Sequence, residues 1–348
     1  PLDQPYNDTR SNKMKRIVVT GGAGFIGSAF VRNQLIDYPD VHIVTFDKMT
    51  YAGNLENVRD VDPDRHTFIK GDIADYDAIH KAMEGCDAIV NFAADTHVDR
   101  SILEATDFIS TNVTGVYNIL EAAKNLSTQR VLLVSTDEIY GSIIEGSFKE
   151  SDPPQPKNPY SASKAGGELV ALAHHNTYGT PVIITRGSNT YGPYQYPEKI
   201  MPLFITNLID GLKVPLYSGG EHNVRDWLYV DDHARGIDTA LRKGEFGSVY
   251  NVAGDNEREN IFLTNRLLEL LGKDDSSIQL VRDRPGHDFR YSIDAGKLHD
   301  LGWKPKMNWD EGIEKTVNWF RDNEKWWRPI KSGEFKEYYE RQYANREV

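Results

Sequence analysis

Two adjacent carboxylates, Asp137 and Glu138, follow Thr136 at the end of an apolar segment, residues 131–134. An apolar run of this length predicts a buried strand, so both carboxylates should lie at a strand end. Two acids packed closely do not ionise together easily, and their pKa values separate so that one serves as acid and the other as base. The pair therefore indicates a proton transfer beyond simple alcohol oxidation, for which Thr136 would supply a hydroxyl. A helix N-cap or a surface Asp–Glu pair is the alternative.

Tyr160 and Lys164 form a second reactive pair just downstream. Asn158 and Pro159 are a typical N-cap and first-turn pair, so Tyr160 should open a helix. Residues i and i+4 share a helix face, roughly 5–6 Å apart at Cβ. A tyrosine with a pKa near 10 is a poor base, but an ammonium within about 4–6 Å lowers that pKa by one to three units. Tyr160 is thus predicted to take a proton from a hydroxyl while hydride leaves the same carbon. For this motif alone, a surface Tyr–Lys pair is the alternative.

Three glycines, Gly21, Gly24 and Gly27, lie between an apolar run and an amphipathic stretch. This spacing permits a tight turn, close approach of the backbone to a pyrophosphate and close helix–strand packing. A second apolar run ends in Asp47, about 20 residues past the last glycine, where a carboxylate accepts both ribose hydroxyls of a dinucleotide. Asp47 would repel a 2′-phosphate, which favours NAD over NADP, and the positive nicotinamide would lower the Tyr160 pKa further. A plain glycine turn with a solvent-facing aspartate is the alternative.

Apolar runs alternate with amphipathic stretches through the first half of the chain. Repeated strand–helix units of this kind predict an α/β fold, a Rossmann-type doubly wound parallel sheet with ligands at the carboxyl ends of its strands. Past Arg186 the segments shorten and Pro, Gly and aromatic residues become frequent, which predicts a smaller C-terminal α/β domain that binds the substrate. Trp319, Phe320, Trp326 and Trp327 are expected in its core or packing surface rather than in a platform for a ligand. The expected strands are residues 16–20, 42–46, 67–69, 88–92, 131–135 and 182–185, and the expected helices include 112–124 and 161–178.

The chain of 348 residues carries a formal net charge of −12 and one cysteine, Cys86. The charge and the lack of a basic stripe argue against nucleic acid as a partner, and one cysteine allows no intrachain disulfide. No apolar run approaches the roughly 18–20 residues of a membrane span, and residues 1–13 lack the apolar core of a secretory signal. We therefore expect a cytoplasmic protein with no membrane partner, with Met14 as its natural start and residues 1–13 as a tag remnant or disordered extension. His174 and His175 lie mid-helix without a ligand cluster, so no metal is expected.

Longer motifs resemble the nucleoside-diphosphate-glucose 4,6-dehydratases of the extended short-chain dehydrogenase/reductase family. The dTDP-glucose enzymes are the closest in pattern, and the resemblance runs from about residue 15 to the end of the chain. The TDE and RPGHD segments are far more specific than the glycine motif. The motifs are GGAGFIGS at 21–28, DKMTYAGN at 47–54, HVDRS at 97–101, TDEIYG at 136–141, YSASK at 160–164, RGSNTYGPYQYPEKIMP at 186–202, VRDWLYVDDH at 224–233 and DRPGHDFRYSID at 283–294.

The resemblance implies a reaction in three steps on dTDP-glucose. NAD accepts hydride from C4 of the glucose, with Tyr160 as base and Thr136 hydrogen-bonded to O4. The resulting ketone acidifies the C5 proton, which Glu138 removes while Asp137 protonates the C6 hydroxyl, and water leaves. Hydride then returns to C6 and gives a 4-keto-6-deoxy sugar. NAD ends as it began and should stay bound through turnover.

The resemblance also implies a domain division and binding residues. Residues 14–190 would form the NAD-binding domain, with a returning segment near 225–255, and residues 191–348 would mainly bind the nucleotide sugar. A homodimer is implied through the helices near 112–124 and 161–178. The implied cofactor-binding residues are Gly21, Gly24, Phe25, Ile26, Gly27, Asp47, Lys48, Met49, Thr50, Asp72, Ile73, Phe92, Ala93, Ala94, Asp95, Thr111, Tyr160, Lys164 and Thr190. The implied substrate-binding residues are Thr96, Thr136, Asn189, Lys199, Pro202, Leu203, Pro215, Tyr217, Arg225, Asn260, Asp283, Arg284, Pro285, Gly286 and His287.

Two segments depart from the family pattern. Most members read AESH where this chain has ADTH at 94–97, and CSNN where it has GSNT at 187–190. Asp95 is one methylene shorter than Glu, so a contact beside the cofactor is expected to be reshaped.

Three alternative functions share parts of the pattern. A UDP-glucose 4,6-dehydratase would bind a similar pyrimidine and two phosphates. A UDP-sugar 4-epimerase would use Tyr160 and Lys164 but has no use for Asp137 and Glu138. A non-catalytic NAD(H)-sensing protein predicts loss of the tyrosine or the lysine, and both are present.

Overall fold

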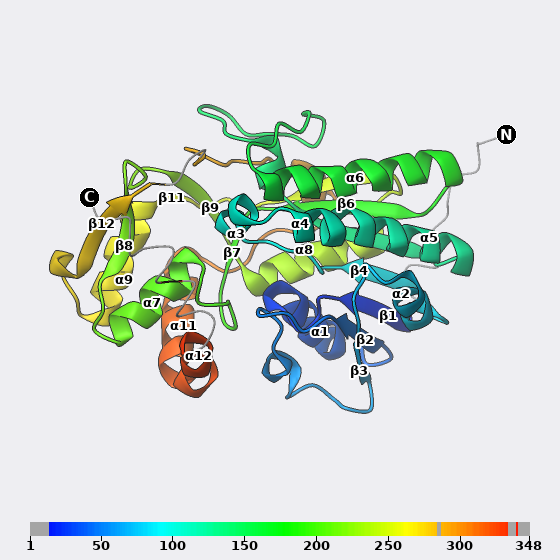
Figure 1. Cartoon of the computed structure of the whole chain (residues 1–348), viewed down its shortest axis with the longest axis horizontal. Helices are drawn as coiled ribbons and strands as arrows, with labels where there is room; N and C mark the ends of the chain where they lie inside the picture. Colours follow the sequence, from blue (N-terminus) through cyan, green and yellow to red (C-terminus); the bar gives the residue numbers. More distant parts are fainter. Residues whose placement is uncertain (1–13, 284–286, 333–338, 340–348) are drawn as a thin grey trace.

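A seven-stranded parallel sheet forms the larger part of the molecule (Figure 1). The protein is represented by a computed structural model that describes residues 14–283, 287–332 and 339. The strand order is β10-β6-β5-β4-β1-β2-β3, so the chain runs outward from β1 in both directions. This is the topology of a doubly wound sheet, and the predicted α/β fold is confirmed. Its strands are β1 (Arg16–Thr20), β2 (His42–Asp47), β3 (His66–Lys70), β4 (Ala88–Asn91), β5 (Arg130–Thr136), β6 (Val182–Gly187) and β10 (Ser248–Val252).

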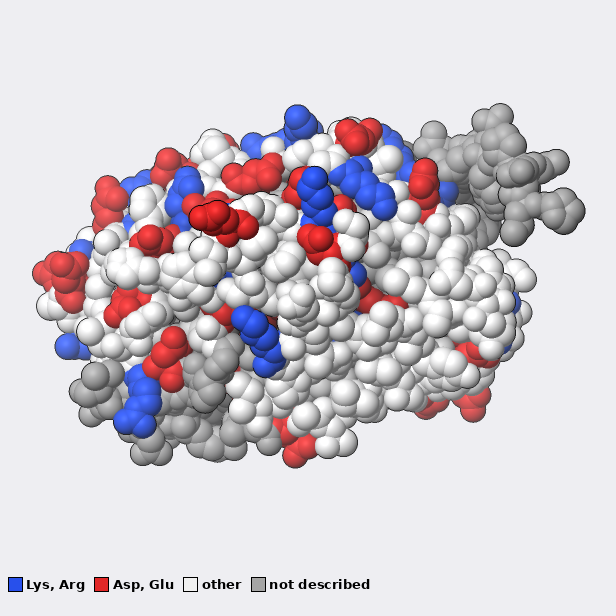
Figure 2. Space-filling model, turned by 90° about the horizontal axis from the view of Figure 1, so that it is seen from above, with Lys and Arg blue, Asp and Glu red and all other residues white. Residues whose placement is uncertain are grey.

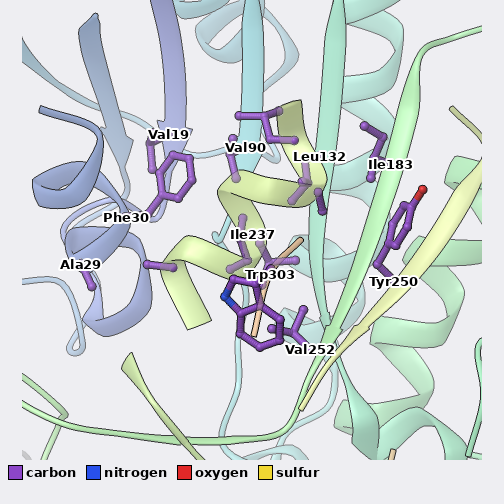
Figure 3. Packing of buried hydrophobic residues seen from close by; sticks show 14 of the residues in the cluster. Val19, Ala29, Phe30, Val90, Leu132, Ile183, Ile237, Tyr250, Val252 and Trp303 are labelled. Atoms are coloured by element: carbon purple, nitrogen blue, oxygen red, sulfur yellow. The ribbon is translucent and has the colours of Figure 1, made fainter. Parts of the chain in front are cut away.

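Alternate residues of the central strands pack on opposite faces of this sheet. Ile17 and Val19 of β1 belong to one buried cluster together with Phe30, whereas Val18 belongs to a second cluster. Figure 3 shows part of the first cluster, in which Phe30 and Ile237 lie beneath strand residues such as Val19. Burial on both faces explains why these strands are continuous apolar runs rather than alternating ones.

Helices cover both faces of the sheet. Helices α1 and α8 contribute Phe30 and Ile237 to the first cluster, and α2, α5 and α6 contribute Ile79, Ile119 and Ala171 to the second. The helix predicted at 112–124 begins with a π-helical turn, which the sequence pattern did not indicate. The helices around this sheet are α1 (Phe25–Asp37), η2 (Leu55–Val58), α2 (Tyr76–Met83), α3 (Val98–Leu103), α4 (Thr106–Ile109), the π-helix η3 (Ser110–Gly115), α5 (Val116–Leu126), η4 (Asp137–Tyr140), α6 (Pro159–Tyr178), α8 (Val230–Lys243) and α10 (Gly296–Asp300).

The remaining elements form a smaller body with its own core, on the left of Figure 1. It contains the sheets β11-β9-β7 and β12-β8. Phe320 and Trp327 are fully buried in its core, as predicted, together with Phe204 and Trp227. The elements are β7 (Asn189–Tyr191), α7 (Ile200–Ile209), β8 (Val214–Ser218), β9 (Val224–Tyr229), β11 (Glu257–Glu259), α9 (Asn260–Leu271), η5 (Asp275–Ser277), β12 (Ile278–Arg282), α11 (Trp309–Asp322) and α12 (Glu324–Lys331).

Charged side chains of both signs are interspersed on the face shown in Figure 2. Across the described ranges, no helix is long and apolar enough to cross a membrane. The predicted extension at residues 1–13 lies outside the described residues, and the predicted domain boundaries stay predictions.

Candidate active site

A cavity of about 760 Å³ lies at the carboxyl ends of the parallel strands, and both reactive pairs line it. This is the position at which doubly wound sheets bind ligands, and the size is typical of small-molecule sites. Most of the predicted site residues meet here. Those that line the cavity are Gly21, Gly24, Phe25, Ile26, Gly27, Asp47, Lys48, Thr50, Asp72, Ile73, Phe92, Ala93, Ala94, Asp95, Thr96, Thr111, Thr136, Asp137, Glu138, Tyr160, Lys164, Asn189, Thr190 and Lys199.

The glycine-rich turn connects β1 to α1 at one end of the cavity. Gly21 has φ +66°, and a Cβ at this position would lie 2.6 Å from the backbone nitrogen of Ala93. Both features exclude a side chain at Gly21. Gly24 and Gly27 line the cavity, so backbone rather than side chains faces a ligand there. The turn therefore forms the kind of cradle that a pyrophosphate requires.

Asp47 at the end of β2 connects the glycine turn to the next loop. Its carboxylate accepts hydrogen bonds from the backbone nitrogens of Ala23 (3.0 Å) and Met49 (2.8 Å). Burial raises its pKa, and these two bonds oppose the shift. One lone pair on each oxygen is left for a ribose hydroxyl. Met49 itself lies outside the cavity lining and supports Asp47 through its backbone nitrogen, so its direct contact with the cofactor stays a prediction.

Two further polar pairs face the cavity from neighbouring loops. Lys48 forms a 2.8 Å ion pair with Asp72, and the hydrogen bond to that carboxylate raises the Lys48 pKa. Thr111 donates its hydroxyl to Asp95 at 2.8 Å. The short Asp95 side chain is therefore held against the π-helix η3 that carries Thr111.

The carboxylate pair begins the short helix η4 at the end of β5. Thr136 accepts the backbone N–H of Glu138 as N-cap and donates its hydroxyl to Asp137 at 3.3 Å. Asp137 is 3% exposed, and its Oδ2 has no hydrogen-bond partner within the described part of the chain. Burial, then the charges of Glu138 and Asp226, raise the Asp137 pKa well above its ordinary value, against a smaller lowering by Arg225. The raised pKa favours the protonated form of Asp137, which lines the same cavity as Glu138.

The Tyr160–Lys164 pair sits in the first turns of α6. The predicted cap is confirmed, since Asn158 accepts the Ser161 N–H in a capping box with Pro159 in the first turn. Lys164 donates its ammonium to the carbonyl of Val134 at 2.7 Å, and burial lowers its pKa to about 8.

The expected lowering of the Tyr160 pKa is wrong for this structure. Burial raises that pKa, the charge of Glu138 raises it further, and a hydrogen bond with Thr136 opposes the shift. Lys164 is not among the groups that offset the burial, and its ammonium donates a hydrogen bond to the Val134 carbonyl instead. Activation of Tyr160 therefore requires additional positive charge in the cavity.

Eight predicted substrate residues lie apart from the lining of this cavity. Arg225 is buried beneath the segment 287–291: it donates to the carbonyl of Asp288 (2.8 Å), contacts His287 (3.0 Å) and lies 4.4 Å from the ring of Tyr291. Arg225 therefore contacts a neighbouring loop in this structure, and its contact with phosphate stays a prediction. The residues outside the lining are Pro202, Leu203, Pro215, Tyr217, Arg225, Asn260, Asp283 and His287, and Arg284, Pro285 and Gly286 lie outside the described residues.

Several cavity residues were not predicted individually. Glu198 is buried, accepts hydrogen bonds from Tyr51 (3.1 Å) and Arg100 (3.3 Å), and has a pKa raised by burial. The Arg100 guanidinium also lies 3.9 Å from the Tyr51 ring. Tyr51, Arg100 and Glu198 belong to three of the family-like motifs, at 47–54, 97–101 and 186–202. Their contact with one another was not predicted, because these three segments are far apart in the sequence. Trp326 packs against the core of the smaller body, as predicted, and also lines the cavity, which was not predicted.

His233 lines the cavity beside Thr190. Its Nδ1 lies 2.7 Å from the Thr190 hydroxyl, and burial lowers its pKa to about 4, so the ring is neutral at pH 7. The ring packs directly against Gly187, where an added Cβ would lie 2.4 Å from it. The glycine at position 187, where the family pattern has a larger residue, therefore leaves the space that the His233 ring occupies.

Comparison with known proteins agrees with this geometry. The family described as GDP-mannose 4,6 dehydratase matches residues 18–316. A dTDP-glucose 4,6-dehydratase of Streptomyces niveus is 48% identical over 323 residues, covering 91% of this chain and 96% of the relative. The crystal structure of a dTDP-glucose 4,6-dehydratase from Streptomyces venezuelae with NAD and TYD bound has a TM-score of 0.88 at 51% identity, covering 90% and 99% of the two chains. A UDP-glucose 4-epimerase from Thermus thermophilus in complex with NAD has a TM-score of 0.82 at 32% identity, covering 88% and 99%. The chain therefore belongs to the GDP-mannose 4,6 dehydratase family, in which its relatives include dTDP-glucose 4,6-dehydratases.

Proposed function

We propose that the protein is a dTDP-glucose 4,6-dehydratase, an NAD-dependent hydro-lyase of deoxysugar biosynthesis that converts dTDP-glucose to dTDP-4-keto-6-deoxyglucose. The observation that carries the proposal is the placement of Asp137 and Glu138 in one cavity with Tyr160 and Lys164. An epimerase needs the second pair alone, whereas removal of water needs an acid and a base as well.

NAD is the cofactor. The glycine turn supplies a backbone cradle, and the buried Asp47 keeps acceptor capacity for ribose hydroxyls. When bound, NAD would supply a hydride acceptor for C4 of the glucose, positive charge beside Tyr160 and a hydride source for C6. Lys48 and Asp72, with Asp95 and its partner Thr111, would complete the walls around it.

Tyr160 and Thr136 would act at the 4-hydroxyl. Thr136 holds O4 by a hydrogen bond, and Tyr160 accepts the O4 proton as the C4–H bond breaks. The buried Lys164, with a pKa of about 8, lies one helical turn from Tyr160 on the same helix face, where its ammonium would be available to the bound cofactor. Because Tyr160 is also close to Glu138, the charge state of Glu138 would influence this first step.

Glu138 and Asp137 would then remove water. The C4 ketone makes the C5 proton acidic, and Glu138 takes that proton as the C5–C6 double bond forms. Asp137 donates its proton to the departing C6 hydroxyl, so that water rather than hydroxide leaves. Burial and the charge of Glu138 favour this division, since both raise the Asp137 pKa and so favour the form that carries the proton. A proton returned to C5 accompanies the hydride that returns to C6.

The remaining assignments are also proposals. Thr96, Asn189 and Lys199 would face the sugar and phosphates from the cavity wall, and Lys199 already donates to the Thr96 carbonyl at 3.3 Å. The nucleotide would require the cluster around Arg225 to open toward it. A cytoplasmic homodimer through α5 and α6 is supported by exposed apolar side chains on these helices, Tyr117 and Leu169.

Incubation with dTDP-glucose, followed by alkali, tests the function. A 4-keto-6-deoxy product absorbs in the near ultraviolet after alkali, whereas an epimerase would yield dTDP-galactose and a sensor would leave the sugar unchanged. The same assay with UDP-glucose separates the two dehydratase alternatives by their rates.

A further inference from the structure

Helix α12 is fixed to the smaller body on one side and faces the cofactor cavity on the other. Trp327 is fully buried and donates its indole N–H to the Phe320 carbonyl at 2.8 Å, and Lys331 pairs with Asp210 at 3.0 Å. Trp326 and Ile330, four residues apart and hence on one helix face, both line the cavity. The helix follows the segment that matches the family, residues 18–316.

Trp326 is connected to the glycine turn through a single buried amide. Its indole N–H donates to Oδ1 of Asn57 at 2.9 Å, and the Nδ2–H of Asn57 donates to the carbonyl of Ala23 at 2.9 Å. Asn57 is 2% exposed, and its bond to Ala23 is buried, whereas the bond from the half-buried Trp326 is partly buried. Ala23 lies within the glycine turn, between Gly21 and Gly24. A continuous chain of hydrogen bonds thus runs from the C-terminal helix to the turn that would hold the pyrophosphate.

A second connection runs parallel to the first. Tyr194 also lines the cavity, and its backbone has φ +68°, a left-handed conformation that non-glycine residues seldom adopt. Its ring contacts Trp319 (4.6 Å between centroids), Trp326 (5.9 Å) and the Arg32 guanidinium (4.5 Å). Arg32 in turn donates to the backbone carbonyl of Asn57 at 2.6 Å. Both connections reach Asn57, which contacts the glycine turn through its bond to Ala23.

We infer that Trp326 and Asn57 retain the dinucleotide, because α12 bridges the two bodies across the cavity and holds the glycine turn. The inference rests on the proposed use of NAD. It explains how a cofactor that is regenerated in each cycle stays in place while the nucleotide sugar exchanges. Neither residue takes part in proton transfer, and both act as positioning residues for the cofactor site.

The test compares release of NAD from the purified holoenzyme and its variants. Trp326→Phe keeps an aromatic ring in the cavity wall and removes the N–H donor. Trp319→Phe is the matched control, since Trp319 contacts the same aromatic group but lies outside the cavity lining. Each protein is diluted into buffer with an enzyme that consumes free NAD, and remaining bound NAD is measured with time.

We expect Trp326→Phe to release NAD roughly 2- to 10-fold faster than wild type, the range for loss of one buried hydrogen bond. Trp319→Phe should release NAD at the wild-type rate. Asn57→Ala should accelerate release as well, and the double variant should add little to it, because both changes break the same chain. Dehydration activity of Trp326→Phe should decay faster after dilution and recover when NAD is added back.

Release from Trp326→Phe at the wild-type rate, with an unchanged melting temperature, would overturn the inference. Equal acceleration by Trp319→Phe would also overturn it, because general loosening of the aromatic group would then be the cause. Failure of the proposed function has a different signature: wild-type protein that neither contains nor binds NAD. If Asn57→Ala does not fold, Trp326→Phe still decides the question, since Trp326 is only half-buried.

Discussion

Replacement of Asp137 by Asn tests whether a buried, protonated carboxyl expels the C6 hydroxyl. The amide has nearly the same shape and can accept the same hydrogen bond from Thr136. It cannot donate an acidic proton. Removal of a positioned acid slows a reaction by about 10²–10⁴-fold, or about 3–5 kcal/mol in the activation barrier. We therefore expect dehydration to slow by that factor, while oxidation at C4 remains.

The assay follows product by absorbance after alkali and bound NADH by its near-ultraviolet absorbance before quenching. Asp137→Asn should accumulate NADH on addition of dTDP-glucose and form product slowly. Glu145→Gln, which removes an exposed carboxylate on the following loop, should match wild type in both measurements. Product formation by Asp137→Asn at the wild-type rate would refute the assignment of Asp137 as the acid.

The same substitution has a consequence for stability. Because the folded pKa of Asp137 lies above its unfolded value, the folded state holds its proton more tightly. The corresponding stability is complete below the unfolded pKa, about 4, and is lost as pH rises through the folded pKa. Asparagine has no such proton to lose. Urea unfolding at several pH values should therefore show that the stability of Asp137→Asn increases relative to that of wild type as the pH rises. A stability difference that stays constant with pH would contradict the assignment of Asp137 as a buried acid.

Three further substitutions test other parts of the structure. Lys164→Met should abolish turnover yet raise the free energy of unfolding of the cofactor-free protein by about 3 kcal/mol below pH 8, because the folded pKa of Lys164, about 8, lies below its unfolded value. This gain in stability should fade as the pH rises from 8 past about 10.4. Urea unfolding across this pH range measures it, and a difference that does not depend on pH would contradict it. Glu168→Gln leaves the buried Arg186 without its 2.7 Å ion-pair partner, so we expect the free energy of unfolding to fall by about 3–5 kcal/mol. A decrease under about 1 kcal/mol would mean that the ion pair is not shielded from water. Gly187→Ala should lower the free energy of unfolding by about 1–3 kcal/mol and weaken NAD binding, because the new Cβ would lie 2.4 Å from the ring of His233. An unchanged melting temperature and NAD affinity would show that the His233 ring moves freely.

Sequence patterns were sufficient for the sheet and for the reactive pairs. Residues 131–134 of strand β5 are an uninterrupted apolar run, so Asp137 and Glu138 were expected at its carboxyl end. The cap of α6 followed from Asn158 and Pro159, which have local preferences that no distant contact overrides. In both cases the structure depends on preferences of residues that are close together in the sequence.

The parts that could not be predicted depend on contacts distant in sequence. The indole of Trp326 bonds Asn57, 269 residues away, and no local signal distinguishes it from the fully buried Trp327 beside it. Arg225 contacts a loop about 60 residues downstream, which removes it from the cavity lining. The pKa of Tyr160 is set by burial and by the charge of Glu138, which depend on the folded surroundings rather than on the spacing of its motif.

The central claim is that a C4 ketone forms first and that Glu138 then removes the C5 proton. Glu138→Gln keeps the shape of the side chain and removes the base, so it measures this order directly. Mixing the variant with dTDP-glucose should give a rapid rise in bound NADH absorbance with no product that absorbs after alkali. Product at the wild-type rate, or no NADH signal from a variant that still binds the sugar nucleotide, would contradict the claim.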